Sequence, residues 1–367
     1  MPSGGDWGLQ RSAALFLQNS AGVNISGCTI ERVDGNAIIL SGHNAETSIM
    51  GNQIRWTGDS AIAAWGFTDE MGNGGQNGID GTKDAHPRDT LVANNLIHEL
   101  GVFEKQSSMF FQAKTARSTI RNNVFFNGPR AGINFNDGFG GGSLVTENLI
   151  FNTCRESGDH GPFNSWDRQP FLTVDSATGV TSLAPAVNHI TRNFIFADYS
   201  GVKALDHDDG SSYYDDSENV IFMGWMHKNY LPAVGRKHTF NTLGLFAAWG
   251  MHDNSLIQSD APVDWAESMT NCTIIAAAGK TFNYASLPTS KGTSCDSSAG
   301  LAKQVTMGGN TIYTDEASEV KISCGSKQGG YTMGEWQALG HDQGSTLTKK
   351  LPSDDEITTL VRDWLQF

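Results

Sequence analysis

The stretch TIRNNVFFNGPRAGINFNDGFGGGSLVTENLI, residues 119–150, contains the same short motif twice. "NVF" begins at Asn123 and "NLI" begins at Asn148, so the motif returns after 25 residues. A second apolar segment, "AGINFND" at 131–137, lies between the two copies. A unit of this size holds two or three short strands and is too small to bury a face alone, so neighbouring units must stack on one another.

The motif, an Asn or Cys followed by any residue and then by an aliphatic residue or Phe, recurs along the chain. It begins at Cys28, Asn52, Asn95, Asn123, Asn148, Asn193, Asn219, Asn241, Cys272 and Asn310. Most copies are spaced by about 25 residues, and the longer gaps of 43 and 45 residues indicate coils with an inserted loop. The second apolar element follows in several units, beginning at Gly35, Gly58, Ala131 and Ser200.

These repeats predict an all-β fold, a right-handed parallel β-helix with inserted loops. Asn side chains stacked at equivalent corners can hydrogen-bond along the axis, as Asn ladders do in other stacked β structures. A propeller fits less well, because its blades need about 40 residues and four antiparallel strands.

The composition excludes several classes of partner. The chain has 367 residues, a net charge of −14 and no runs of Lys or Arg, which argues against binding to nucleic acid. No apolar stretch reaches about 18 residues, so no membrane insertion is expected. The oligomeric state stays open. The five cysteines show no C-x-x-C spacing, which argues against a zinc site. His160 and His207 each neighbour an Asp, which is a weak pattern for a metal, and we expect no metal and no cofactor. Cys295 and Cys324 are the best candidates for a disulfide, and we expect most other cysteines to be buried small residues.

The two ends of the chain differ from its body. The first residues have no signal-peptide pattern and enter patterned sequence at once, which indicates that the N-terminal coils are truncated. We expect residues 1–325 to form the β-helix catalytic domain and 326–367 an irregular C-terminal segment. Within that segment Ser353 is a candidate N-cap, and Ile357, Leu360, Val361 and Trp364 recur at helical spacing. They predict a short helix that covers the last coil and blunts its edge.

Carboxylates gather at one angular position of three successive coils. Asp137 lies 14 residues after Asn123, and Asp167 lies 19 residues after Asn148. Asp206, Asp208 and Asp209 lie 13, 15 and 16 residues after Asn193. Because equivalent side chains of adjacent coils lie about 4.8 Å apart, these aspartates are candidates for a shared cleft. A chance cluster is the alternative, since Asp is common in turns.

Asp167 belongs to an irregular segment, ESGDHGPFNSWDRQPF at 156–171, that crowds unlike side chains beside the carboxylates. Carboxylates, aromatic faces and hydroxyl-binding side chains together are typical of sugar chemistry. The candidate substrate-binding residues are His160, Trp166, Arg168, His207, Tyr213, Tyr214 and Lys114. Each has a structural alternative: the aromatic residues could fill the solenoid, Arg168 could pair with a buried Asp, and Lys114 could simply balance the acidic cleft.

The repeats together with "HGPFNSWDRQP" at 160–170 and "DHDDGSSYY" at 206–214 resemble the right-handed β-helix glycoside hydrolases of the pectate-lyase-like superfamily, most closely glycoside hydrolase family 141. Activities in that family include α-L-fucosidase and xylanase, so the resemblance implies hydrolysis of a plant or algal cell-wall glycan by an extracellular or periplasmic enzyme. It also implies two catalytic aspartates, which correspond to Asp167 and to Asp208, with Asp209, Asp206 and Asp137 as alternatives.

Other functions share this fold. A polysaccharide lyase or epimerase would need a basic residue in the cleft, for which Arg168 and Lys114 are the candidates, and the acidic net charge disfavours a polyanionic substrate. A non-catalytic solenoid that binds glycan or builds a fibre is the third possibility. Between the two catalytic alternatives, sensitivity to a chelator discriminates, because hydrolysis by two carboxylates needs no metal.

Overall fold

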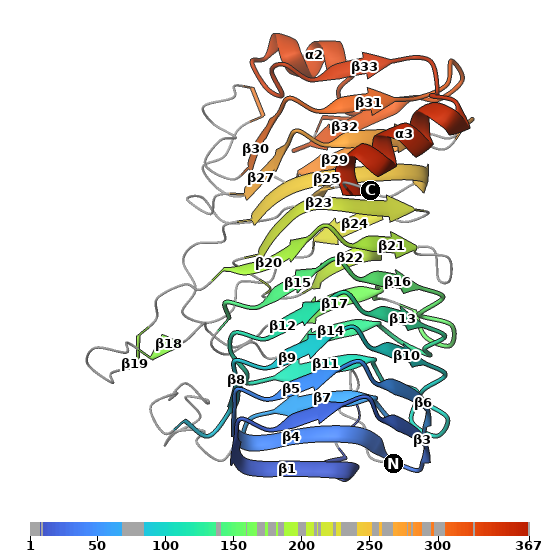
Figure 1. The fold of residues 1–367 in the computed structure, drawn as a ribbon. Coiled ribbons are helices and arrows are strands. Elements are labelled where there is room, and N and C mark those ends of the chain that lie inside the picture. Colours follow the sequence, from blue (N-terminus) through green and yellow to red (C-terminus); the bar gives the residue numbers. More distant parts are fainter. Residues whose placement is uncertain are drawn as a thin grey trace.

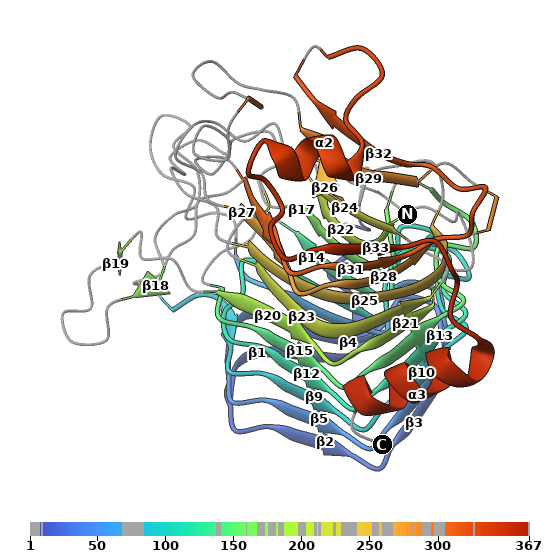
Figure 2. The same ribbon diagram turned by 90° about the horizontal axis from the view of Figure 1, so that it is seen from above.

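The chain winds into a parallel β-helix, seen from the side in the computed structural model (Figure 1) and along its axis in Figure 2. Successive coils stack from the N-terminal to the C-terminal end, and most coils contribute one strand to each of three arrays. The structure describes residues 8, 10–67, 84–136, 141–158, 160–166, 173–174, 181–182, 187–196, 203–208, 211, 214–222, 225–228, 241–251, 257–258, 267–276, 278–279, 282–287, 295–296, 305–325 and 327–365.

The first array carries the candidate site and consists of parallel strands from successive coils. It contains β1 (Ala13–Ala21), β4 (Asn36–Ala45), β7 (Ile62–Trp65), β11 (Phe110–Ala113), β14 (Ile133–Asn136), β17 (Phe163–Trp166), β22 (Lys203–Asp208) and β24 (Trp225–Lys228), with β8 (Pro87–Arg88) beside β4. Near the C-terminal end, three further parallel strands form a separate sheet: β26 (Ile257–Gln258), β29 (Phe282–Leu287) and β32 (Val320–Cys324).

The second and third arrays meet at a bend and together form the largest sheet. The second contains β2 (Asn24–Ser26), β5 (Ser48–Met50), β9 (Leu91–Ala93), β12 (Thr119–Arg121), β15 (Leu144–Thr146), β20 (Asn188–Thr191), β27 (Glu267–Thr270) and β30 (Val305–Gly308). The third contains β3 (Thr29–Val33), β6 (Gln53–Thr57), β10 (Leu96–His98), β13 (Val124–Phe126), β16 (Leu149–Phe151), β21 (Phe194–Phe196), β28 (Thr273–Ala276), β31 (Thr311–Tyr313) and β33 (Thr346–Thr348). Two long strands, β23 (Tyr214–Phe222) and β25 (Asn241–Met251), run through both arrays.

The interior of the coils is filled by rows of apolar side chains. One row runs in register from Ile54 through Ile97, Phe125 and Ile150 to Ile195, each fully or almost fully buried. A single stacked core of this kind is what units too small to fold alone produce. A short antiparallel pair, β18 (Thr173–Val174) with β19 (Thr181–Ser182), lies apart from the coils (Figure 2).

The predicted Asn ladder runs along the bend between the second and third arrays. The Nδ2 of each ladder Asn donates to the Oδ1 of the next over 2.9–3.0 Å, and the members are Asn52, Asn95, Asn123, Asn148, Asn193 and Asn219. The residue before each ladder position has a positive φ, for example Asn122 at 55° and Glu147 at 58°. That left-handed residue makes the bend, and the Asn amide then satisfies backbone groups there. The repeat motif therefore marks the corner of each coil.

One copy of the motif does not belong to the ladder. The position that faces Asn219 in the next coil is Leu245, and Asn241 lies in the other half of β25, where it faces Glu267. The corner position therefore lies 26 residues after Asn219, whereas Asn241 lies only 22 residues after it. The expectation for "NTL" at Asn241 was wrong, because the motif in this coil falls four residues before the corner. The ladder position returns at Cys272, whose backbone N–H donates to Asn310 Oδ1 over 2.8 Å.

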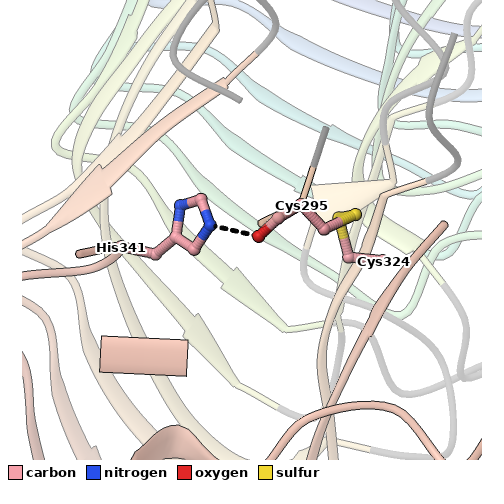
Figure 3. The surroundings of a disulfide bond; sticks show 3 residues. All are labelled: Cys295, Cys324 and His341. Carbon is pink, nitrogen blue, oxygen red and sulfur yellow. Dashed lines mark hydrogen bonds between the residues drawn. A yellow bond between two sulfur atoms is a disulfide. The ribbon is translucent and has the colours of Figure 1, made fainter. Parts of the chain in front are cut away.

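The C-terminal end is closed by α2 (Met333–Ala338) and the turns around it. Trp336 of α2 is fully buried in the core cluster and stacks on His341, with 3.9 Å between ring centroids. His341 Nε2 lies 2.8 Å from the carbonyl oxygen of Cys295, and Cys295 forms a disulfide with Cys324 (Figure 3). The predicted disulfide is confirmed. Cys154 and Cys272 are buried free thiols, whereas Cys28 is exposed.

The predicted C-terminal helix is present as α3 (Asp354–Leu365), but its place differs from the expectation. Ser353 and Glu356 form a capping box before it, with Ser353 N–H donating to Glu356 over 2.7 Å. Ile357 packs with Val220 of β23 and Ile275 of β28, so the helix lies against the outer side of the coils and not over the last one (Figure 1). Within the described residues no helix is long and apolar enough to span a membrane.

Candidate functional site

Polar side chains line the outer face of three neighbouring strands, β14, β17 and β22. Ile133, Phe163 and Leu205 face one another across the three strands, and all three side chains belong to the core. Because strand residues alternate between faces, the residues that follow at odd steps point outward. We call these six residues the outer polar ladder: Asn134, Asn136, Asn164, Trp166, Asp206 and Asp208.

The register of the strands pairs these residues rung by rung. Asn134, Asn164 and Asp206 occupy facing positions, and two residues further along Asn136, Trp166 and Asp208 do the same. Facing residues on neighbouring strands are about 4.8 Å apart along the axis. β17 and β22 are hydrogen-bonded neighbours, so the 42 residues from Trp166 to Asp208 span one coil. An indole and a carboxylate therefore lie side by side at the ends of adjacent strands.

The six residues differ in how far they are buried. Asn134 and Asp206 are completely buried, and Asn164 donates from Nδ2 to Asn134 Oδ1 over 3.0 Å. Trp166 and Asp208 are half-buried, so both reach solvent at the edge of the site. Asn136 is only 1% exposed, and neither its Oδ1 nor its Nδ2 has a hydrogen-bond partner among the described residues.

Several predicted residues lie outside the described part of the chain. They are Asp167, Arg168, Asp137, Asp209 and Tyr213. In the sequence Asp167 directly follows Trp166 and Asp137 directly follows Asn136, so both come one residue after the rung that ends in Asp208.

Two of the predicted sugar-binding residues are located inside the solenoid. His207 is completely buried, with Nδ1 2.8 Å from Ser165 Oγ and Nε2 2.6 Å from Asp216 Oδ2. Tyr214 is also completely buried and contacts the His207 ring, at 4.4 Å between centroids. A side chain in the filled core cannot touch a ligand on the outer face, so the expectation for both residues is corrected. The structural alternative, interior packing, applies to them.

His160 and Lys114 are buried as well. His160 is 2% exposed, with Nε2 2.8 Å from Ser157 Oγ. Lys114 is 5% exposed and donates to the carbonyl oxygen of Phe67. It follows Ala113, which faces Asp208 across three strand-to-strand steps of the first array. Lys114, the predicted substrate contact, therefore lies about 14 Å along the axis from the coil that carries Asp208.

An arginine and a buried histidine lie beside β7, an earlier strand of the same array. The Arg11 guanidinium lies 4.3 Å from the centroid of the Trp65 ring and donates to the carbonyl oxygens of Trp65 and Gly66. The pKa of the neighbouring His86 is lowered to about 4, chiefly because the ring is buried, so this histidine is neutral at pH 7. The array thus has the Arg11 guanidinium near β7 and carboxyl groups at β22.

Sequence reasoning missed the three asparagines of the outer polar ladder. The segment "INFN" at 133–136 alternates apolar and polar residues, which is the signal of a half-buried strand. That alternation places the asparagines on the outer face together with the aspartates, and it is the signal from which they could have been predicted.

The described residues offer no stronger site elsewhere. A hollow of about 470 Å³ beside α3 is lined by Tyr313, Leu351 and Leu360, but its carboxylates, Asp355 and Glu356, belong to the first turn of the helix, and Glu356 is used in the cap. No group of three or more His, Cys, Asp or Glu side chains suited to a metal ion occurs within the described ranges. The outer polar ladder is therefore the best candidate site.

No family model matches the chain, and no curated protein matches it. Among solved structures the chain is similar to the complex of XylC with xylose, at 12% sequence identity and a TM-score of 0.48. The match covers 91% of this chain and 48% of that one, so the chain spans about half the length of that protein.

Proposed function

We propose that the protein is a glycoside hydrolase that cleaves a complex cell-wall or algal polysaccharide at the outer polar ladder. The observation that carries the proposal is the rung formed by Trp166 and Asp208 on adjacent coils, with Asp167 next in the chain. An aromatic face beside a carboxylate pair offers stacking for a sugar ring and the two acidic groups that glycosidic cleavage requires. The resemblance of the segments at 160–170 and 206–214 to family 141 supports the same assignment.

The expected mechanism follows from the coil spacing. Carboxylates on adjacent coils differ by about 4.8 Å along the axis, which favours the separation of about 5 to 5.5 Å used by retaining enzymes. Asp208 ends a regular strand and is the proposed nucleophile. Asp167 is the proposed acid/base, because the neighbouring indole would partly desolvate its carboxyl group and favour the protonated form.

An oxidising compartment fits this role. Cys295 and Cys324 form a disulfide near the C-terminal end, and such bonds persist chiefly in secreted and periplasmic proteins. We propose that the enzyme works outside the cytoplasm.

The test is a screen of the purified protein against aryl glycosides and cell-wall glycans, with proton NMR of the first-formed anomer of any product. Release of a retained anomer that is insensitive to EDTA supports the proposal. An inverted anomer overturns the division of roles, and an unsaturated, EDTA-sensitive product would identify a lyase instead. Binding without turnover by any glycan of the panel would favour a non-catalytic solenoid.

A further inference from the structure

The amide of Asn136 is the unusual group in the outer polar ladder. It is 1% exposed, and neither amide atom has a hydrogen-bond partner in the described part of the chain. Buried side-chain amides are nearly always paired, because removing them from water without a partner is costly. An unpaired amide on the face of a candidate site therefore calls for a physical reason.

The facing residues explain why the described part of the chain supplies no partner. On one side the facing residue is Ala113, which has no polar side-chain atom, and on the other side it is Trp166. Two residues earlier in the same strands the situation differs. Asn134 and Asn164 face each other there, and Asn164 Nδ2 donates to Asn134 Oδ1 over 3.0 Å. Two asparagines on one strand, two residues apart and pointing to the same face, thus have opposite hydrogen-bonding states.

We propose that Asn136 is a ligand-binding residue that recognises a pair of adjacent hydroxyl groups on an uncharged sugar. A side-chain amide offers one acceptor and a two-proton donor, so it can accept from one hydroxyl and donate to the next. The ring of that sugar would lie along Trp166. The strand of Trp166 lies between the strands of Asn136 and Asp208, and the three residues occupy facing positions. The sugar site therefore extends from the carboxylate toward β14.

The charge of the site indicates the class of sugar. Its described polar groups are three amides and the carboxyl groups of Asp206 and Asp208, with no cationic side chain among the six. A uronate placed there would bring its own carboxylate close to the carboxyl groups of Asp206 and Asp208, whereas a neutral pyranose would meet an amide, an indole and a carboxyl group. Because the amide is covered in the free chain, neighbouring side chains must shift to admit a hydroxyl, a rotamer-scale change that is common at binding sites.

Asn136→Leu tests the inference, because leucine has similar branching and removes both polar atoms. We expect this variant to be more stable than the wild type in thermal unfolding, since an unpaired buried amide is lost. Asn134→Leu is the matched control on the same strand, and it should lower the melting temperature because Asn164 loses its acceptor. A decrease for Asn136→Leu similar to that of Asn134→Leu would overturn the inference.

Binding is measured by calorimetry with xylohexaose, cellohexaose and mannohexaose as neutral probes and hexagalacturonate as the charged probe. We expect Asn136→Leu to weaken the best neutral probe about tenfold or more, the loss of two hydrogen bonds. Unchanged affinity, or preference for hexagalacturonate, would overturn the inference. It rests on the proposed function only in that the ligand is a sugar: binding without hydrolysis would refute the enzyme and leave Asn136 in its role, whereas hydrolysis with unchanged affinity would refute Asn136 alone.

Discussion

Nε2 of His207 lies 2.6 Å from Oδ2 of Asp216 inside the solenoid, where neither side chain is exposed. The preceding residue, Asp215, forms a second pair with His189, at 3.1 Å between Oδ2 and Nδ1, but there the side chains are 27% and 50% exposed. The alternation along β23 thus points two consecutive aspartates to opposite faces, each toward a histidine. The solenoid therefore has two similar His–Asp contacts, one in its core and one at its surface.

These two pairs should contribute very differently to stability. His207→Leu leaves Asp216 buried without its partner, which we expect to lower the free energy of unfolding by about 3 to 5 kcal/mol. His189→Leu removes an exposed partner and should change it by less than about 1 kcal/mol. Chemical denaturation of both variants measures the difference. If both variants lose the same free energy of unfolding, burial does not make the interior pair more important for stability than the exposed one.

The Asn ladder should be equally measurable. Asn123→Ala removes the acceptor of both the backbone N–H and the Nδ2 of Asn95, at 2.9 and 3.0 Å. Leaving buried donors unpaired should cost about 1 to 3 kcal/mol of stability. Asn24→Ala is the control, because Asn24 is an exposed residue in a strand and not a ladder member. A melting temperature unchanged by Asn123→Ala would contradict a stabilising role of the ladder.

The disulfide near the C-terminal end is a third target. Cys295 and Cys324 are 29 residues apart, and the loss of a loop of that length from the unfolded ensemble corresponds to about 3 to 4 kcal/mol. Replacing both cysteines by Ala should lower stability by that order, and a reductant should have the same effect on the wild type. Cys28→Ala, which removes an exposed free thiol, serves as the control. Insensitivity of the wild type to reductant would show that the bond adds little to stability.

The sequence allowed the solenoid, the corner asparagines, the disulfide and the terminal helix to be predicted, because each leaves a local or periodic pattern. The assignments of His207 and Tyr214 failed because the face to which a strand residue points depends on its exact place in the strand, and one residue decides between the outer face and the core. The assignment of Asn241 failed because the motif in that coil lies four residues before the corner position. The role of Asn136 could not be predicted from the sequence, because it depends on which residues of the neighbouring coils face its amide.

Asp59 gives a prediction with a defined pH dependence. It is 1% exposed, and burial, with a smaller contribution from the Glu104 carboxylate, raises the pKa of its carboxyl group. Its Oδ1 accepts from Ser60 N–H over 2.8 Å and from Ser107 Oγ over 2.9 Å, whereas Oδ2 has no partner among the described residues. An Asn side chain keeps the Oδ1 acceptor and removes the buried charge, so Asp59→Asn should raise the melting temperature at pH 7.

The sign of the pH effect follows from linkage. The unfolded chain releases the Asp59 proton near pH 4, whereas the folded protein holds it to a higher pH, so the wild type loses stability as pH rises through this window. The advantage of Asp59→Asn should therefore grow from pH 3 to pH 7. Asp315→Asn is the opposite control, because hydrogen bonds from Ser318 lower the pKa of Asp315 and the variant should be less stable at pH 7. An advantage of Asp59→Asn that is independent of pH would exclude the carboxyl charge as its cause.

The proposed catalytic role is tested most directly at Asp208. Asp208→Asn conserves volume and removes ionisation, so on a substrate found in the screen it should lower kcat by about a thousandfold or more while leaving the melting temperature nearly unchanged. Asp215→Asn makes the same substitution seven residues further along the same coil, on another face, and should leave kcat unchanged. The adjacent Asp209 decides between neighbours: an active Asp208→Asn together with an inactive Asp209→Asn would move the role by one residue. Since alternation in β22 directs Asp208 outward beside Trp166, such a result would also contradict the rung from which the function was inferred.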